Sequence, residues 1–222
     1  MDIEAGVAKV QLPAPVASVF EMRSYDMVPS RMDDYLNLVN HSLQEIRRDQ
    51  YGRLVGFWRS GCGAALKVHH LWEFTSLDAR QKMREELARR EDWIDFLRNV
   101  APCIQAQSIT FLRIQGNLTS ILSTGNAYQL IRYQARVGKL GNALREIQHQ
   151  VSDDSVTRIG IWAADAPDPN EVWELLAVSR RTENEEGCAG EGEYVKWIPR
   201  HEELVRRHST LWLVPISISP LN

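Results

Sequence analysis

The chain has 222 residues, of which 44% are hydrophobic and 25% are charged, and its formal net charge is −3. This length allows one large domain or two small ones with a real buried core. The charges are of mixed sign and form no long like-charged block, which argues against a nucleic-acid groove and against a polybasic membrane patch.

The cysteines and the N-terminal residues bear on the cellular compartment. Cys62, Cys103 and Cys188 are widely spaced and form no CxxC pair, so they indicate a reducing compartment rather than a disulfide framework or a zinc knuckle. Residues 1–18 have acidic residues near the start and lack the apolar stretch of a signal peptide. No apolar run approaches the length of a membrane span. We therefore predict a cytoplasmic protein with a flexible N-terminal arm over residues 1–18.

The first half of the chain alternates between strand and helix patterns. Side chains alternate at strand spacing in VFEMRSY, whereas apolar residues recur at helical spacing from Met32 to Ile46. RLVGFW and LKVHHLWEF are typical of two hairpin strands because a glycine-rich turn separates them. Ser76 is expected to begin a second, interrupted helix, and SITFLRI is typical of a last strand. We predict strand, helix, strand, strand, helix and strand over residues 19–25, 30–52, 53–58, 66–74, 76–101 and 108–114.

The second half repeats this pattern. Residues 20–32 match residues 128–140, and the glycine and tryptophan of LVGFW match those of RIGIW. In the same alignment KVHHLWEF falls on EVWELLAV, so that His69 and His70 correspond to Trp173 and Glu174. Such self-similarity indicates a duplicated structural unit. We predict a first repeat over residues 19–115, a linker over residues 116–126 and a second, degenerate repeat over residues 127–222.

Duplication of a βαββαβ unit determines how the sheets can be covered. One unit forms a four-stranded antiparallel sheet with both helices on one face, which leaves the other face apolar and open. Two units can cover each other's open face by closing their sheets into a barrel, which also limits exposed strand edges. The predicted fold is therefore α+β, with two tandem ferredoxin-like βαββαβ repeats that form a dimeric α/β-barrel pseudo-dimer within one chain.

Four motifs in the first half, taken in order, resemble the NIPSNAP family of the dimeric α/β-barrel superfamily. These are FEMRSY, VPSRMDDYL, GRLVGFW and HLWEFTSLDAR, followed by Trp93. The second half resembles the family only faintly, through QLIRY, VGKL and IGIW. Two departures are Ser30, where the family usually has glycine, and the loss of the His-x-Trp pattern at Glu174 and Leu176. The second departure puts an equivalent site in the second half in doubt.

The resemblance implies a barrel fold more firmly than a reaction. Relatives of this barrel include cofactor-independent monooxygenases of aromatic polyketides, isomerases, haem-binding decarboxylases and dehydratases, and proteins with interaction roles only. Because one fold supports many activities, the function has to be argued from the site residues themselves.

Polar residues on otherwise apolar strands are the candidates for chemistry. Strand alternation places His69 and Glu73 on one face of their strand and His70 with Trp72 on the other. We assign the polar set, which is Glu21, Arg23, Tyr25, His69 and Glu73, to the barrel lumen. We assign Phe20, Met22, His70 and Trp72 to the helix side, with an inward orientation of His70 and Trp72 as the alternative.

The predicted catalytic residues are Arg23, His69, His70 and Glu73. Arg23 would orient an anionic or carbonyl oxygen, while Glu73 or His69 would move a proton. The structural alternative is a salt-bridge network of Glu21, Arg23 and Glu73 that joins the half-barrels, together with histidines that are simply hydrogen-bonded core residues.

Aromatic residues in both halves are candidates for the walls of a pocket. They are expected to surround a small apolar or aromatic metabolite, with core filling as the alternative for each tryptophan. The predicted substrate-binding residues are Glu21, Tyr25, Trp58, Trp72, Tyr133, Trp162 and Trp173.

No cofactor or metal is predicted from the sequence. The glycine-rich stretches do not lie at a strand-to-helix turn, and no pair of histidines has the spacing of a helical metal site. The hypothesis is therefore a cofactor-independent enzyme that binds and converts a small apolar metabolite in a barrel cavity. It would be a cyclase, an isomerase or a monooxygenase, and a homodimer beyond the internal pseudo-dimer is possible.

Two alternatives remain open at this point. One is a non-catalytic interaction module that uses residues 1–18 and the polar segment 180–193. The other is a haem protein with His69 or His70 as ligand, which only the family resemblance implies.

Overall fold

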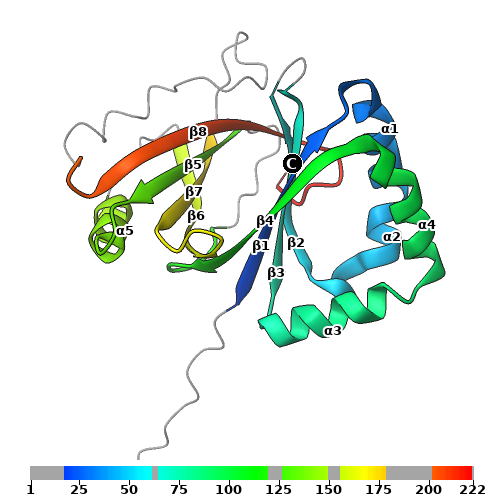
Figure 1. Ribbon diagram of the computed structural model, residues 1–222, viewed down its shortest axis with the longest axis horizontal. Helices are drawn as coiled ribbons and strands as arrows, with labels where there is room; N and C mark the ends of the chain where they lie inside the picture. Colours follow the sequence, from blue (N-terminus) through cyan, green and yellow to red (C-terminus); the bar gives the residue numbers. More distant parts are fainter. Residues whose placement is uncertain (1–17, 62–64, 120–126, 150–155, 179–201, 222) are drawn as a thin grey trace, which may run out of the picture.

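The computed structural model describes residues 18–61, 65–119, 127–149, 156–178 and 202–221. Its first half begins with strand β1, continues through a helical segment to the hairpin β2 and β3, and ends with two helices and strand β4 (Figure 1). The strands of this half are β1 (Val19–Met27), β2 (Arg53–Ser60), β3 (Lys67–Phe74) and β4 (Ile104–Ile114). The helices are α1 (Met32–Leu38), α2 (Gln44–Arg47), α3 (Leu77–Leu87) and α4 (Glu91–Val100).

The described part of the second half contains four strands and one helix. They are β5 (Ala127–Ala135), α5 (Leu140–His149), β6 (Val156–Ala166), β7 (Glu171–Val178) and β8 (Val205–Pro215). The second helix expected in this half, together with the polar segment 180–193, lies outside the described residues, as do most of the predicted arm and linker.

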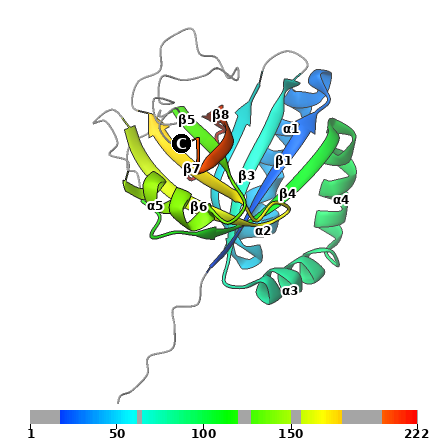
Figure 2. The same ribbon diagram turned by 60° about the vertical axis from the view of Figure 1, so that its left-hand side comes forward.

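The eight strands form one closed barrel with the order β1-β3-β2-β8-β5-β7-β6-β4. Each half contributes four antiparallel strands in the same relative order, and the halves join where β4 pairs with β6 and where β2 pairs with β8. Closure of the sheet within a single chain was predicted and is confirmed. Helices α1 to α4 cover the outside of the first half, and α5 lies on the outside of the second (Figures 1 and 2).

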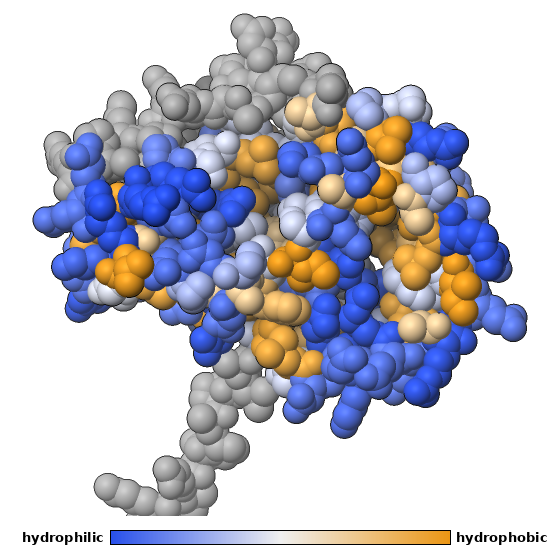
Figure 3. Space-filling view, in the orientation of Figure 1, coloured by the Kyte–Doolittle hydropathy of each residue, from blue (hydrophilic) through white to orange (hydrophobic). Residues whose placement is uncertain are grey.

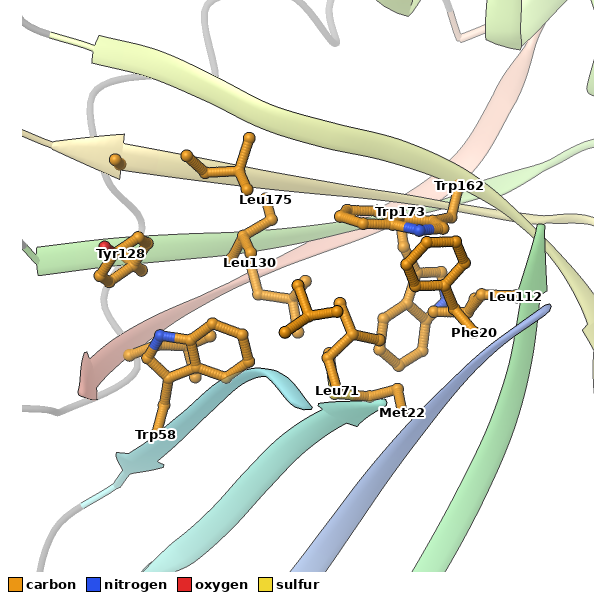
Figure 4. Packing of buried hydrophobic residues seen from close by; sticks show 14 of the residues in the cluster. Phe20, Met22, Trp58, Leu71, Leu112, Tyr128, Leu130, Trp162, Trp173 and Leu175 are labelled. Carbon is orange, nitrogen blue, oxygen red and sulfur yellow. The ribbon is translucent and has the colours of Figure 1, made fainter. Parts of the chain in front are cut away.

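Large apolar side chains from both halves fill the middle of the barrel. Phe20, Met22 and Leu71 of the first half point toward Leu130 and Trp173 of the second half (Figure 4). All five side chains are buried. Because burial of apolar surface stabilises a fold in proportion to the area removed from water, this shared core holds the two halves together.

The predicted orientation of β1 is wrong. Phe20 and Met22 belong to the core that fills the lumen, so strand alternation places Glu21, Arg23 and Tyr25 on the opposite face, toward the helices. Arg23 pairs there with His70 on β3. Strand alternation separates the two sets of side chains but does not say which set is inside. The apolar side chains of β1 pack in the lumen, which both halves of the sheet surround, and its charged side chains lie toward the helices.

A Gly-x-Trp pattern has the same structural role in both halves. A Cβ atom at Gly56 would lie 2.1 Å from the ring of Trp58, and a Cβ atom at Gly160 would lie 2.6 Å from the ring of Trp162. Both tryptophans are fully buried in the lumen core. Glycine is therefore required at these positions because each indole lies directly against the backbone of its own strand.

The helical layer of the first half departs from one regular helix. Between α1 and α2 the chain forms a π-helical turn, Val39–Leu43, a feature that often occurs at functional sites. The expected helix start at Ser76 is confirmed, and its hydroxyl caps the helix by accepting a hydrogen bond from the backbone nitrogen of Ala79 at 3.0 Å. The helix that follows is interrupted, as predicted, into α3 and α4.

The residues after β8 return to the first half. The backbone nitrogen of Ile216 donates to the carbonyl of Phe57, and the hydroxyl of Ser219 accepts from the backbone nitrogen of Phe57. Ile216 and Ile218 are buried among the residues beneath the first-half helices. The end of the chain therefore stabilises the junction where β2 and β8 share only two residue pairs.

Candidate functional site

A cavity of about 470 Å³ lies between the outer face of the first-half sheet and its helices. We call it the helix-side pocket. Figure 3 shows a hollow edged by hydrophobic residues between the helices at the right and the neighbouring strands. The polar groups that line the pocket are the side chains of Arg23, Tyr25, Tyr35, Arg47, His70, Arg84, Gln105 and Gln107, together with the indoles of Trp72 and Trp93.

The imidazole of His70 is held in one protonation state. Its Nδ1 atom accepts a hydrogen bond from the indole Nε1 of Trp72, so the ring proton belongs on Nε2. Burial, followed by the positive charges of Arg23 and Arg47, lowers the pKa of His70 well below its ordinary value. His70 is therefore a neutral hydrogen-bond donor, and its buried Nε2 atom has no partner among the described residues.

Arg47 is a buried guanidinium in the same pocket. Only 5% of the residue is exposed, and the guanidinium carbon lies 3.5 Å from the centre of the Trp72 ring. Its Nη2 atom donates to the carbonyl of Tyr51, whereas its buried Nε atom has no partner in the described part of the chain. Burial, and secondly the charge of Arg23, lowers the pKa of Arg47 to about 9. The group is still cationic at neutral pH.

Two more arginines line the pocket. Arg23 donates to Glu21 at 3.0 Å and to Gln107 at 3.4 Å, and its Nε atom is buried without a described partner. Glu21 also binds Arg80, so that two guanidinium groups share this carboxylate. Arg84 is half-buried, and burial followed by the charge of Arg23 lowers its pKa.

Aromatic rings enclose the imidazole. The centre of the His70 ring lies 5.0 Å from that of Tyr25 in an edge-on arrangement and 4.8 Å from that of Phe57. Tyr35 is buried, and desolvation raises the pKa of its phenol well above the ordinary value, which keeps the phenol neutral. Phe96 adds an apolar wall, so the pocket combines a few polar groups with aromatic surfaces, as ligand pockets usually do.

His69 and Glu73 lie away from this pocket. The two ring nitrogens of His69 lie 2.8 Å from the hydroxyls of Ser24 and Ser60, and burial lowers the pKa of this histidine to about 4. Glu73 forms a salt bridge with Arg53, whose side chain is more than half exposed. The predicted convergence of Glu21, Arg23 and Glu73 in the lumen is therefore wrong, because alternation sends Glu73 to the opposite face from Glu21 and Arg23.

The predicted aromatic set is divided between several places. Trp72 lines the helix-side pocket, whereas Trp58 and Trp162 are fully buried in the lumen core. Trp173 reaches the polar mouth of the lumen, and Tyr133 lies on the outer face of the second half. These residues do not form one shared pocket.

A second cavity, of about 510 Å³, occupies the mouth of the lumen. We call it the lumen-mouth cavity. Its polar lining includes His69, the ion pair of Asp26 with Lys67, and Arg132, which binds Glu171 at 2.7 Å. These charges are already paired with one another, so this cavity offers a ligand fewer unsatisfied groups than the helix-side pocket does.

The outer face of the second-half sheet, which corresponds to the face of the helix-side pocket, has different polar residues. Glu174 occupies the register position of His70, opposite Ile131 where the first half has Arg23. Its carboxylate accepts hydrogen bonds from Arg158 at 2.7 Å and from the hydroxyl of Tyr133 at 3.0 Å. Burial raises the pKa of Glu174 despite these partners. The second half thus supplies its half-buried Arg158 with a carboxylate of its own.

Sequence reasoning did not identify Arg47 and Arg84 as site residues. A signal for Arg47 was present, because it follows Val39 and Leu43 at steps of four residues on the buried side of the helical segment. An arginine that continues an apolar stripe at helical spacing is a candidate for a buried charge. Arg84 carries no comparable signal, since it lies on a helix rich in charged residues.

The closed barrel with helices on its outside defines an α/β barrel whose sheet is built by the two halves of one chain. A proposed monooxygenase from Fusobacterium nucleatum has this fold, with a TM-score of 0.66, 8% identity and coverage of 92% of this chain and 94% of its own. A proposed monooxygenase from Lactobacillus acidophilus gives a TM-score of 0.59, 12% identity and coverage of 90% and 95%. At these identities the likeness shows the fold alone.

The sequence of the first half is similar to a known family. Residues 20–115 match the NIPSNAP family model. The human protein NipSnap homolog 3A is 26% identical over 220 residues, which cover 91% of this chain and 85% of the relative. Residues 20–115 are therefore similar to the NIPSNAP family, as their motifs predicted, and this match lies in the half that contains the helix-side pocket.

Two features are absent from the residues that the structure describes. No group of three or more His, Cys, Asp or Glu side chains in the described ranges is placed to hold a metal ion. Within the same ranges, no helix is both long and apolar enough to cross a membrane.

Proposed function

We propose that the protein binds a small, largely apolar metabolite in the helix-side pocket and converts it by cofactor-independent acid/base chemistry. The reaction would be of the cyclase, isomerase or monooxygenase type. The observation that best supports this proposal is the neutral imidazole of His70, whose Nε2–H donor is buried without a described partner at the wall of an aromatic cavity. A buried donor without a partner costs about 1–3 kcal/mol, and an oxygen of the metabolite would remove that cost.

The proposed chemistry is polarisation of a carbonyl or hydroxyl oxygen. A neutral imidazole that donates to a carbonyl oxygen makes the adjacent carbon more acidic. When that carbon loses its proton, negative charge develops on the oxygen, where the guanidinium of Arg23 stabilises it. The described lining contains no carboxylate, so the proton passes to water at the exposed rim near Ala101 and Gln105.

This proposal reassigns the predicted roles. Arg23 keeps the role of stabilising an oxygen, and His70 replaces His69 and Glu73 as the group that acts on the metabolite. Trp72 positions His70 by fixing its tautomer, while Tyr25 packs edge-on against its ring. Glu21 holds Arg23 in place from the neighbouring position on the same strand face.

The test uses 2-tetralone, a neutral aromatic ketone with acidic protons next to its carbonyl. In D₂O the full chain is expected to accelerate exchange of these protons for deuterium above the buffer rate, as followed by proton NMR. His70→Phe keeps an aromatic ring but removes the donor, so it is expected to lose the acceleration. Ala101→Trp, which fills the rim of the helix-side pocket, is expected to lose it too.

The matched control is Ser209→Trp, which places the same bulk at the lumen-mouth cavity and is expected to leave the exchange unchanged. Absence of acceleration by the unaltered chain would contradict the proposal. So would acceleration that survives both His70→Phe and Ala101→Trp. Loss of acceleration in Ser209→Trp alone would place the site in the lumen instead.

We also infer that the two halves are tandem ferredoxin-like repeats. Their common strand order and the equivalent register of the pairs Arg23–His70 and Ile131–Glu174 support this inference. The non-catalytic alternative rested on residues 1–18 and 180–193, which lie almost entirely outside the described residues. No contact or cavity of the described part favours it over the pocket.

A further inference from the structure

We propose that the metabolite of the helix-side pocket is an organic carboxylate and that Arg47 and Arg84 bind its carboxyl group. This inference rests on the proposed function, because it names the class of ligand for the same pocket. It concerns a permanent charge on the ligand, separate from the oxygen that His70 polarises.

Positive charge around the pocket exceeds negative charge. Four guanidinium groups, those of Arg23, Arg47, Arg80 and Arg84, surround one carboxylate, that of Glu21. Glu21 is taken by Arg23 and Arg80. Neither Arg47 nor Arg84 forms an ion pair with any residue that the structure describes. Because an unpaired buried ion costs several kcal/mol, an anion in this pocket would be strongly stabilised.

The hydrogen bonding of Arg47 leaves room for such an anion. Its guanidinium has five N–H donors, of which the structure assigns one to the carbonyl of Tyr51. Stacking on Trp72 fixes the plane of the group, and its unpartnered Nε atom is buried. A guanidinium held in one plane favours carboxylate, since two parallel N–H groups can bind the two oxygens.

The second half shows how this fold satisfies an arginine in the same layer. There the protein supplies its own carboxylate, Glu174, at the register position of His70. Arg158 and Tyr133 both donate to that carboxylate. In the first half Tyr25 is present, Leu54 stands at the register position of Arg158, and Arg47 and Arg84 come from helices α2 and α3 instead. The position of the carboxylate is occupied by a neutral imidazole. A bound anion would supply the negative charge that Arg47 and Arg84 lack among the described residues.

The rest of the pocket specifies the body of the ligand. Phe57, Phe96, Val100 and Ile104 provide apolar walls. A volume of about 470 Å³ is within the range of small-molecule sites and suits an aromatic or alicyclic acid rather than a short polar one. 2-Naphthoate is a suitable probe, and 2-naphthamide is its uncharged counterpart of nearly equal shape.

The experiment compares these two probes by isothermal titration calorimetry on the full chain. We expect 2-naphthoate to bind about 10-fold to 100-fold more tightly than 2-naphthamide, which corresponds to a charged hydrogen bond of about 1.5–3 kcal/mol. In Arg84→Met this preference is expected to fall to about threefold or less, and Arg47→Met is expected to lower it further. Because Arg84 is half-buried on a helix surface, its variant keeps the test decisive even if Arg47→Met fails to fold.

The control is Arg89→Met, which removes the same charge from an exposed position just after α3. It is expected to keep the preference of the unaltered chain. Equal binding of the acid and the amide would overturn the carboxylate proposal while leaving the pocket itself in place. Binding of neither probe would overturn the proposed function as well. Loss of the preference in Arg89→Met would show that general surface charge, and not the pocket, attracts the acid.

Discussion

Replacement of His69 by glutamine is expected to make the stability of the protein less sensitive to acid. His69 is 4% exposed, and burial, followed by the charge of Lys67, lowers its pKa from 6.5 to about 4. The unfolded chain therefore binds this proton at a higher pH than the folded chain does. The contribution of the neutral His69 to the free energy of unfolding is therefore fully present well above pH 6.5. It is lost as the pH falls from there toward the pKa of the folded chain.

The size of the effect follows from the two pKa values. One pKa unit corresponds to about 1.4 kcal/mol, so the contribution of His69 to the free energy of unfolding decreases by about 2 kcal/mol between pH 7 and pH 5. By pH 4 the decrease reaches about 3 kcal/mol. The depressed pKa of His70 adds a decrease of the same sign, whereas the raised pKa of Glu174 acts in the opposite direction.

The assay is urea unfolding at pH 7, 6, 5 and 4 for the unaltered chain and for His69→Gln. Glutamine was chosen because its amide can contact the hydroxyls of Ser24 and Ser60 without taking up a proton. Since His70 and Glu174 are present in both proteins, the difference between the two pH profiles isolates His69. Parallel profiles would refute the argument, because they would mean that His69 has the same proton affinity in the folded and the unfolded chain.

Two further predictions concern packing and pairing. Gly56→Ala is expected to destabilise the fold by about 1–3 kcal/mol in urea unfolding, because the added Cβ would lie 2.1 Å from the buried Trp58 ring. Gly141→Ala on α5 meets nothing within 4 Å and is expected to be neutral or stabilising, so equal losses in both variants would contradict the packing argument. Glu174→Gln is expected to cost about 1–3 kcal/mol at pH 7, since it removes the charged partner of Arg158. An unchanged urea midpoint would show that this pair contributes nothing.

Much of the fold could be predicted from local pattern. The strand and helix periods, the helix start at Ser76 and the repeated Gly-x-Trp were each visible in the sequence, and the structure contains each of them. The internal match between the halves also predicted closure of the sheet. Each half leaves one apolar face of its sheet uncovered, and the two faces can cover each other within one chain. These features depend on neighbours in sequence or on a comparison of two segments.

The site was predicted less completely. Arg23, His70 and Trp72 were named and do line one pocket, but Glu73 and His69 are elsewhere, and Arg47 and Arg84 were missed. A sequence shows that two strand faces exist, yet each face acquires its chemistry from the element packed against it. Here that element is the helical layer, which adds two arginines to the face that carries Arg23 and His70.

The sequence by itself determined the likeness of the first half to the NIPSNAP family, the order of the described elements and the separation of polar from apolar strand faces. Only the tertiary structure decided that the polar face of β1 looks toward the helices, that Trp72 donates to His70, and that Arg47 is stacked on Trp72. The physical reason is that a strand period of two residues is unchanged when inside and outside are exchanged. Which face is inside depends on how much apolar surface the second half brings to the lumen, and that is a property of the folded chain.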